Sequence, residues 1–277
     1  MKPSASSILL IGESGVGKTH YGAQLLKRLM KGDGHLRMNG AASNLEPFEA
    51  AMESLNEGMA AGHTPTSTYI DSVWPVVDDQ GREAELVWPD YGGEQVKTMF
   101  TSRRVPNAWR ARIADTPAWL LLLRLQQTRV SDDIFSRPLG QLRGTRTQST
   151  EVQVSDQARL IELLQMLMYA RGISNDRPVR TPRLTVLLTC WDELATDRPP
   201  FEILRQQLPM FCDFVTSNWA QPNVLGLSAL ERSLNPRDRD AEYAARGPEK
   251  FGYVVLQDGT RSPDLTLPIR MLLAGVT

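Results

Sequence analysis

The sequence predicts an α/β protein in which a mainly parallel sheet is covered by helices on both faces. Two observations lead to this prediction. Short apolar runs alternate along the chain with segments whose apolar residues recur every three or four positions. Near the start, one apolar run leads through a glycine-rich turn directly into such a helical segment. No repeat of the length found in solenoid proteins interrupts the alternation.

The predicted strands are runs rich in Leu, Ile and Val, at residues 7–11, 67–77, 84–89, 118–125, 184–189 and 223–227, with a further strand at 253–256 before an Asp-Gly turn. The predicted helices lie between them, at residues 19–31, 45–61, 94–102, 153–170, 201–217 and 265–274. The helix at 45–61 carries one apolar stripe, which favours packing on the protein's own core over the alternative of a docking helix for a partner.

Composition is that of an ordinary globular protein. The chain has 277 residues, 41% hydrophobic and 23% charged, and its net charge of −1 gives no general attraction for nucleic acid. Two cysteines make neither a disulfide framework nor a zinc cluster. No signal peptide and no membrane span is expected, because the longest apolar run is far too short to cross a bilayer. These features predict a cytoplasmic protein, of bacterial style.

The most informative stretch fits the pattern G-x-x-x-x-G-K-[ST] at residues 12–19. A strand precedes it and a helix follows, so free main-chain N–H groups and the helix N-terminus converge on one point and form a cradle for phosphate. Lys18 would reach the β- and γ-phosphates, and the Thr19 hydroxyl would bind Mg²⁺. The predicted phosphate-binding residues are Glu13, Ser14, Gly15, Val16, Gly17, Lys18 and Thr19.

A second motif, Asp90-x-x-Gly93, follows the predicted strand at 84–89. At the carboxyl end of a strand beside a phosphate loop, the carboxylate of Asp90 can hold Mg²⁺, usually through a water molecule. The amide of Gly93 can then donate to the γ-phosphate, and the segment shifts when that phosphate leaves.

Two further pieces follow later strands. Thr189-x-x-Asp192 ends the apolar run before it, and its carboxylate can accept two N–H bonds from the edge of guanine. Adenine lacks that pair of donors and would leave a buried acid unpaired. In the segment at 226–230, Ser228 and Ala229 lie where a main-chain amide can bind the guanine carbonyl.

In this order the motifs resemble those of the Ras-like GTPases of the translation-factor-related class. The insert after the first helix and the tail at 262–268 resemble, more narrowly, bacterial proteins of the double-GTPase type. The resemblance implies a three-layer Ras-like P-loop NTPase fold with a mainly parallel six-stranded sheet. It implies one domain over 1–277, with a core at about 6–230, insertions near 32–62 and 126–150, and a C-terminal strand and helix within 251–277.

The resemblance also implies roles for individual residues. A switch threonine that binds Mg²⁺ is expected before the second strand, where Thr64 is favoured over Thr66 and Thr68. The implied reaction is hydrolysis of GTP to GDP and phosphate, with guanine nucleotide as ligand and a protein effector or activator as partner. The implied catalytic residues are Lys18, Gly93, Glu94 and Thr64, and the implied metal-binding residues are Thr19, Asp90 and Thr64.

Three departures from the family pattern keep alternatives open. Cys190 and Leu230 stand where the family has lysines near the base, and Glu94 stands where many relatives have a glutamine that orients water. Slow or partner-activated hydrolysis is therefore expected. The alternatives are a nucleotide-binding scaffold or sensor with little hydrolysis, and a P-loop ATPase or small-molecule kinase.

Two segments are rich in charged residues. Residues 103–146 hold nine arginines and three acids, which favours a solvated basic surface. Two more specific hypotheses for this segment are a binding surface for an acidic partner and an arginine that contacts the triphosphate. Residues 231–248 mix charges of both signs and are expected to form an exposed loop.

Overall fold

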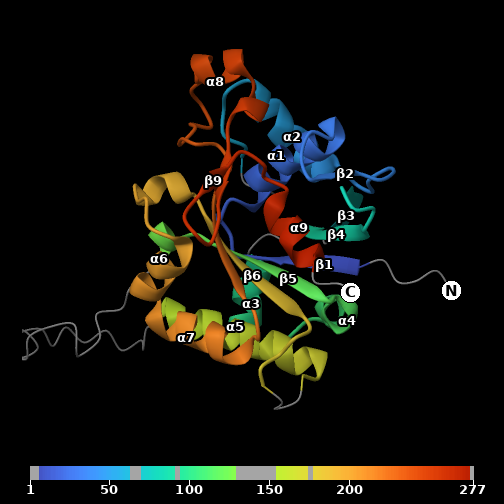
Figure 1. The fold of residues 1–277 in the computed structure, drawn as a ribbon, viewed down its shortest axis with the longest axis vertical. Coiled ribbons are helices and arrows are strands. Elements are labelled where there is room, and N and C mark those ends of the chain that lie inside the picture. The colour runs from blue at the N-terminus through green and yellow to red at the C-terminus, as the bar shows by residue number, and fades with distance from the viewer. Residues whose placement is uncertain (1–5, 63–69, 91–93, 129–153, 174–176, 275–277) are drawn as a thin grey trace, which may run out of the picture.

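The computed structural model describes residues 6–62, 70–90, 94–128, 154–173 and 177–274. Within these ranges, one sheet of nine strands has the order β2-β3-β4-β1-β5-β6-β7-β8-β9 (Figure 1). The strands are β1 (Ser6–Ile11), β2 (Leu36–Met38), β3 (Ile70–Asp78), β4 (Glu83–Asp90), β5 (Ala118–Leu123), β6 (Arg183–Thr189), β7 (Asn223–Ser228), β8 (Tyr253–Val255) and β9 (Arg261–Ser262).

The sheet is parallel only in its centre. Strands β4, β1, β5, β6 and β7 run parallel, whereas β2 with β3, β3 with β4, β7 with β8 and β8 with β9 are antiparallel pairs. The prediction of a mainly parallel six-stranded sheet is therefore wrong in strand number and holds for the central strands alone. A short turn joins β3 to β4, where the Asp78 carboxylate accepts the N–H groups of Gln80 and Arg82, and such a turn can only join antiparallel strands.

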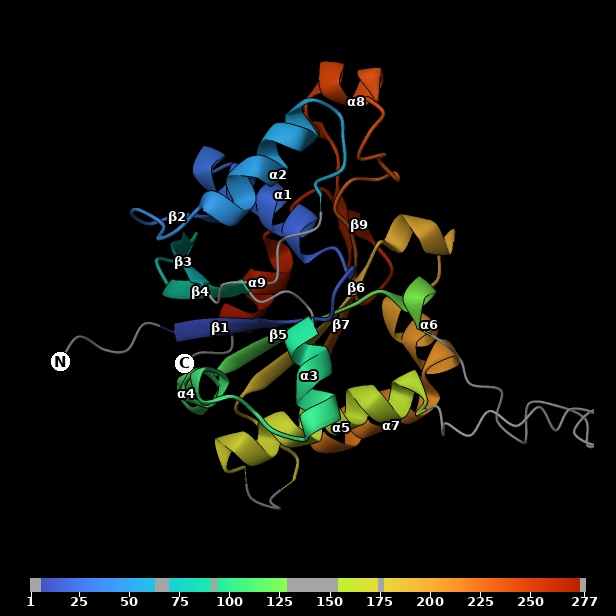
Figure 2. The ribbon, with the colours of Figure 1, turned by 180° about the vertical axis from the view of Figure 1, so that it is seen from behind.

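Helices cover both faces of the sheet (Figure 2). One apolar core joins the sheet to α1, α2 and α9, and a second joins it to the helices α3 to α7. The helices are α1 (Lys18–Lys31), α2 (Glu46–Asn56), α3 (Glu94–Ser102), α4 (Asn107–Asp115), α5 (Asp156–Arg171), α6 (Pro200–Gln207), α7 (Pro209–Asn218), α8 (Ala241–Arg246) and α9 (Leu267–Leu273), with short 3₁₀ turns η1 (Leu125–Gln127), η2 (Trp191–Leu194) and η3 (Pro248–Lys250).

Continuous burial explains why the central strands read as unbroken apolar runs. In β1, Ile8 and Leu10 belong to the core under α1, α2 and α9, while Leu9 and Ile11 belong to the core on the opposite face. Successive side chains of a strand point to opposite faces, so a strand covered on both faces must be apolar at every position. This confirms the predicted α/β class.

Two predicted elements need correction, and one observed helix was not predicted. The helix expected at 201–217 is two helices, α6 and α7, because Pro209 has no N–H to continue the first of them. The segment 231–248 is more than an exposed loop: it contains α8, whose Tyr243 is fully buried and accepts a hydrogen bond from Gln24. Helix α4 was not predicted, since Trp109 and Ile113 are its only buried residues among many polar ones.

The helix expected at 45–61 is observed as the shorter α2, and its apolar stripe faces the protein interior. Phe48 and Leu55 are buried, with Phe48 against Trp74 and Trp88 of the sheet. Gly22 of α1 makes room for it, because a Cβ at Gly22 would lie 2.3 Å from the Phe48 ring. The core-facing interpretation of the stripe is confirmed at these positions.

Candidate functional site

The loop between β1 and α1 has the backbone shape that a phosphate cradle requires. Gly15 and Gly17 have φ angles of 79° and 84°, a region that side-chain-bearing residues rarely adopt. Helix α1 begins directly after Gly17, so the loop ends at a helix N-terminus. The ammonium group of Lys18 donates to the carbonyl oxygen of Gly12 at 2.8 Å and to that of Glu13, which holds the charge over the loop.

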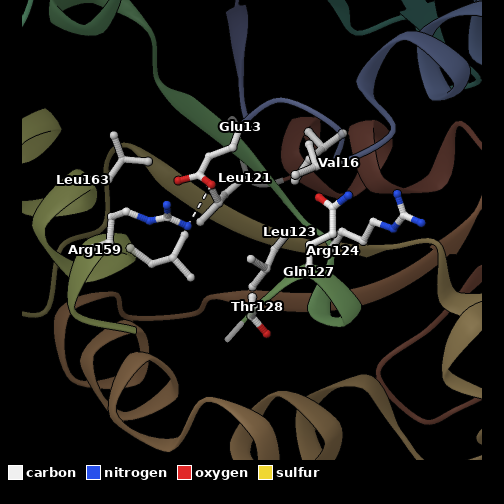
Figure 3. Close-up of a pocket in the computed structure, with 12 residues that line it drawn as sticks. Glu13, Val16, Leu121, Leu123, Arg124, Gln127, Thr128, Arg159 and Leu163 are labelled. Carbon is white, nitrogen blue, oxygen red and sulfur yellow. Dashed lines mark hydrogen bonds and ion pairs between the residues drawn. The ribbon is translucent and has the colours of Figure 1, made fainter. Parts of the chain in front are cut away.

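Side chains from two other elements hold this loop. Arg159 of α5 pairs with the Glu13 carboxylate at 3.0 Å, as Figure 3 shows. The amide group of Gln127 lies against Gly15, since a Cβ at Gly15 would be 3.1 Å from Gln127 Nε2. A larger residue at position 15 would therefore meet both backbone strain and a steric contact.

A cavity begins at the end of this loop and extends to the ends of β6 and β7. Its empty volume is about 670 Å³, part of which is open to solvent. Three of the predicted site residues line it: Gly17, Asp192 and Ala229. The other lining residues are His20, Ala60, Arg124, Thr189, Cys190, Glu193, Leu227, Leu230, Arg232, Ser233 and Leu234.

Ser228 fixes the orientation of Asp192. Its buried hydroxyl donates to Asp192 Oδ1 at 2.5 Å and accepts the N–H of Glu231 at 2.9 Å. One carboxylate oxygen is thereby engaged by the protein. The sequence motifs that contain these two residues are brought together by the parallel pairing of β6 with β7.

Trp191 packs in the core and not in the cavity. It is 1% exposed, and its ring lies against Gly226 of the neighbouring strand β7. The indole therefore offers no stacking surface to a ligand. Its function is to anchor the turn that carries Asp192.

This packing predicts a specific effect of Gly226→Ala. A Cβ at Gly226 would lie 2.6 Å from Trp191 Cε3 and 3.0 Å from Val255 Cβ. We expect a loss of roughly 1–3 kcal/mol in the free energy of unfolding, measured with urea, because both neighbours are buried. Gly62→Ala is the matched control, since no described residue lies within 4 Å of its added methyl group. Equal stability of the two variants would contradict the packing of Trp191.

Two residues of the β6–η2 turn contribute differently to the cavity. Thr189 is buried, lines the cavity, and its hydroxyl oxygen has no hydrogen-bond partner within the part of the chain that the structure describes. Cys190 lies beside Gly17, and burial raises the pKa of its thiol to about 11, so it is neutral at pH 7.

His20, in the first turn of α1, also lines the cavity. Its Nε2 accepts the N–H of Ala61 at 3.0 Å, which places the proton of the neutral ring on Nδ1. Burial, and then the positive charge of Arg124, lower the pKa of His20 below its ordinary value of 6.5.

The lowered pKa of His20 predicts a pH-dependent stability. The unfolded chain takes up a proton below pH 6.5, while the folded ring resists it, so the contribution is complete above that pH and is lost as the pH falls toward the lower, folded value. Urea unfolding at pH 7.5, 6.5 and 5.5 should show a steeper loss for the wild type than for His20→Gln, which does not titrate. Parallel pH profiles would contradict this assignment.

Several predicted residues cannot be placed with their side chains. Thr64 and Gly93, with Thr66 and Thr68, lie outside the described residues. The main chain of Asp90 ends β4, and that of Glu94 begins α3. Because β4 pairs in parallel with β1, Asp90 lies at the same sheet edge as the start of the phosphate loop. The roles of Thr64, Asp90, Gly93 and Glu94 stay predictions.

Among the cavity residues without a predicted role of their own are His20, Glu193 and Arg232, together with Arg124, which the sequence singled out only as one of the nine arginines at 103–146. None belongs to a recognised motif, and they come from four different segments. Arg124 had the strongest available indication, because it is the first charged residue after the buried run of β5, at the carboxyl edge of the sheet.

The glycine loop, its helix and the enclosed lysine define a P-loop nucleotide-binding protein. The chain belongs to the Double-GTPase 1 family, whose model matches residues 9–272. This membership confirms the narrower resemblance predicted from the sequence and supports a GTP-binding protein. None of the curated proteins compared matches the chain.

The chain is also similar to solved structures, among them the following two. The bacterial selenocysteine-specific elongation factor EF-Sec matches with a TM-score of 0.41 and 12% identity, over 99% of this chain and 29% of the factor's length. The SRb-GTP/SRX complex of the signal recognition particle receptor from Chaetomium thermophilum matches with a TM-score of 0.37 and 16% identity, over 84% of this chain and 94% of that one. Neither similarity assigns a function. Among the described helices, none has the length and apolar character needed to cross a bilayer.

Proposed function

We propose that the chain binds guanine nucleotide in this cavity and hydrolyses GTP to GDP and phosphate as a Mg²⁺-dependent switch. The observation that carries the proposal is the position of Asp192. Its carboxylate is oriented by Ser228 on the wall of a cavity that reaches the phosphate loop at Gly17. A nucleotide bound there can place its base at one end and its phosphates at the other.

The base end offers groups that suit guanine. Asp192 can accept the two adjacent N–H donors of the guanine edge, and the amide of Ala229 can donate to the guanine carbonyl. Adenine would leave the carboxylate without donors, and that loss favours guanine.

The phosphate end combines the amides of residues 13–19 with the Lys18 ammonium. A Mg²⁺ ion fits this end, because Thr19 lies in the first turn of α1 and Asp90 ends β4 at the same sheet edge. Mg²⁺ typically takes one or two protein oxygens together with phosphate oxygens, so it needs no larger cluster of ligands. When bound, the ion would neutralise charge on the β- and γ-phosphates.

Hydrolysis requires a water molecule to attack the γ-phosphorus while the bond to the β,γ-bridging oxygen breaks. The protein's part is positioning and charge stabilisation, which Lys18 and the loop amides would supply. Thr64 and the Gly93 amide are proposed to contact the γ-phosphate, and Glu94 is proposed to lie next to the attacking water. Their segments would rearrange once phosphate leaves, which an effector or activating protein could recognise.

Phosphate release from GTP and ATP, each with Mg²⁺ or with EDTA, tests the proposal. We expect GTP to be hydrolysed only with Mg²⁺, at a rate on the order of 10⁻⁴ to 10⁻² s⁻¹ without a partner, and ATP to stay intact. Glu94→Gln should change the rate and leave GTP binding unaltered. Comparable hydrolysis of ATP would contradict the proposal.

A nucleotide-binding scaffold or sensor is the second candidate function. Glu94 favours it, since a carboxylate stands where many relatives have a glutamine. Tight GTP binding with no phosphate release over several hours would support this candidate and exclude intrinsic hydrolysis.

A further inference from the structure

Arg124 joins the phosphate loop to the turn that carries Asp192. It follows directly on β5, and its Nη1 donates to the carbonyl oxygen of Gly15 at 3.2 Å. The same guanidinium forms a two-pronged pair with the Glu193 carboxylate, through Nε at 2.9 Å and through Nη2. In Figure 3 its side chain extends away from the Glu13–Arg159 pair, so the phosphate loop is held at two different places.

Glu193 links this contact to the base end of the cavity. It is the neighbour of Asp192 in η2, and its N–H donates to the carbonyl oxygen of Cys190. Gln126 adds a second hold, because its side chain donates to the Glu193 carbonyl oxygen at 3.1 Å. Residues 124 and 126, which follow β5, therefore hold the turn that carries Asp192 at two points: the side chain of Glu193 and its main-chain carbonyl.

The pair has the features of a strong ion pair. Its side chains are only 27% and 25% exposed, and a two-pronged arginine–carboxylate geometry is stronger and more directional than a single contact. The hydrogen bonds to Glu193 raise the pKa of Arg124, so its charge is permanent at physiological pH. Fully exposed pairs, in contrast, contribute little.

We propose that Arg124 and Glu193 form a positioning bridge that couples the base-binding turn to the phosphate loop, and so slows the release of bound nucleotide. The proposal rests on the proposed function, because it requires a ligand that contacts both ends of the cavity. Arg124 is a positioning residue here and not a catalytic one. Its effect is transmitted through the carbonyl of Gly15 and through the neighbour of Asp192.

Release of fluorescent mant-GDP, chased with excess GDP, tests the bridge. We expect Arg124→Gln and Glu193→Gln each to accelerate release about tenfold or more, and the double variant to behave like either single one. Arg124→Lys should give an intermediate rate, since an ammonium can reach Gly15 but cannot form the two-pronged pair. Multiplied effects in the double variant would overturn the coupling.

A parallel measurement separates the bridge from a role in folding. A purely structural role would lower the melting temperature of the nucleotide-free protein and leave the release rate of the folded protein unchanged, and that result would overturn the proposal. Arg198→Gln is the matched control, because it removes an exposed arginine–glutamate pair with Glu202 at the start of α6. Its release rate should equal that of the wild type.

Failure of the bridge and failure of the proposed function give different results. A wild-type chain that binds mant-GDP but whose Arg124 and Glu193 variants release it at the wild-type rate would overturn the bridge alone. A wild-type chain that binds no guanine nucleotide at all would overturn both.

Discussion

Asp192→Asn is expected to change the base preference of the protein from guanine to xanthine. The carboxylate accepts two N–H donors of guanine, whereas xanthine carries a carbonyl in place of the exocyclic amino group. In the variant, the amide oxygen can keep the hydrogen bond from Ser228, which turns the NH₂ group toward the cavity. A donor then faces the guanine donors and matches the xanthine carbonyl.

The expected effect is large, because a site built for hydrogen bonds discriminates strongly against a ligand that leaves them unmade. We expect GDP affinity to fall by roughly 100-fold or more and XDP affinity to rise above it, both measured by calorimetric titration. Asp197→Asn is the matched control, since Asp197 is an exposed residue paired with Arg261. Unchanged GDP affinity in Asp192→Asn would show that another group reads the base.

Lys18→Ala is expected to remove measurable triphosphate binding. The ammonium is held over the phosphate loop by two main-chain carbonyl oxygens and is thus placed before any ligand arrives. Its loss leaves the negative charge of the β- and γ-phosphates without a positive side chain at the centre of the loop. We expect GTP affinity to fall by at least about 100-fold, which equals about 2.8 kcal/mol at 1.4 kcal/mol for each factor of ten.

The control for this variant lies on the same helix. Lys31→Ala removes an exposed lysine of the last turn of α1, which pairs with Asp33, and should leave GTP affinity unchanged. If Lys18→Ala binds GTP as tightly as the wild type, the glycine loop is not the phosphate site. Circular dichroism of both variants would establish that α1 is still formed.

The sequence predicted the central sheet because burial on both faces leaves a plain pattern. Each central strand is an apolar run between helices, so β1, β4, β5, β6 and β7 were found near their observed positions. The short strands β2 and β9 have two or three residues and no such pattern. The position of β2 is set by its pairing with β3, and that of β9 by its pairing with β8 across the turn at 256–260.

The site was predictable where one short motif contains both the backbone geometry and the chemistry. Gly15, Gly17 and Lys18 are examples, because these neighbouring residues supply both the positive φ angles and the ammonium group. Arg124 and Glu193 are 69 positions apart in the sequence and meet only because β5 and β6 are neighbours in the sheet. No local pattern contains that information.

Partly changed motifs were harder to interpret from sequence alone. Cys190 stands where the family has a lysine, and this change left open how the base end of the site is built. The structure places Trp191 in the core against Gly226, so Asp192 and its neighbours line the cavity without an aromatic wall from that residue. Tertiary packing, and not the motif itself, determined the direction of that side chain.

The central claim is that one cavity holds a guanine nucleotide by its base and its phosphates together. Calorimetric titration of the nucleotide-free wild-type chain with GDP, ADP and guanosine, in Mg²⁺, tests it most directly. The account predicts tight binding of GDP, and at least about 100-fold weaker binding of both ADP, which lacks the base contacts, and guanosine, which lacks the phosphates. Equal affinity for GDP and ADP, or no heat with any of the three, would contradict it.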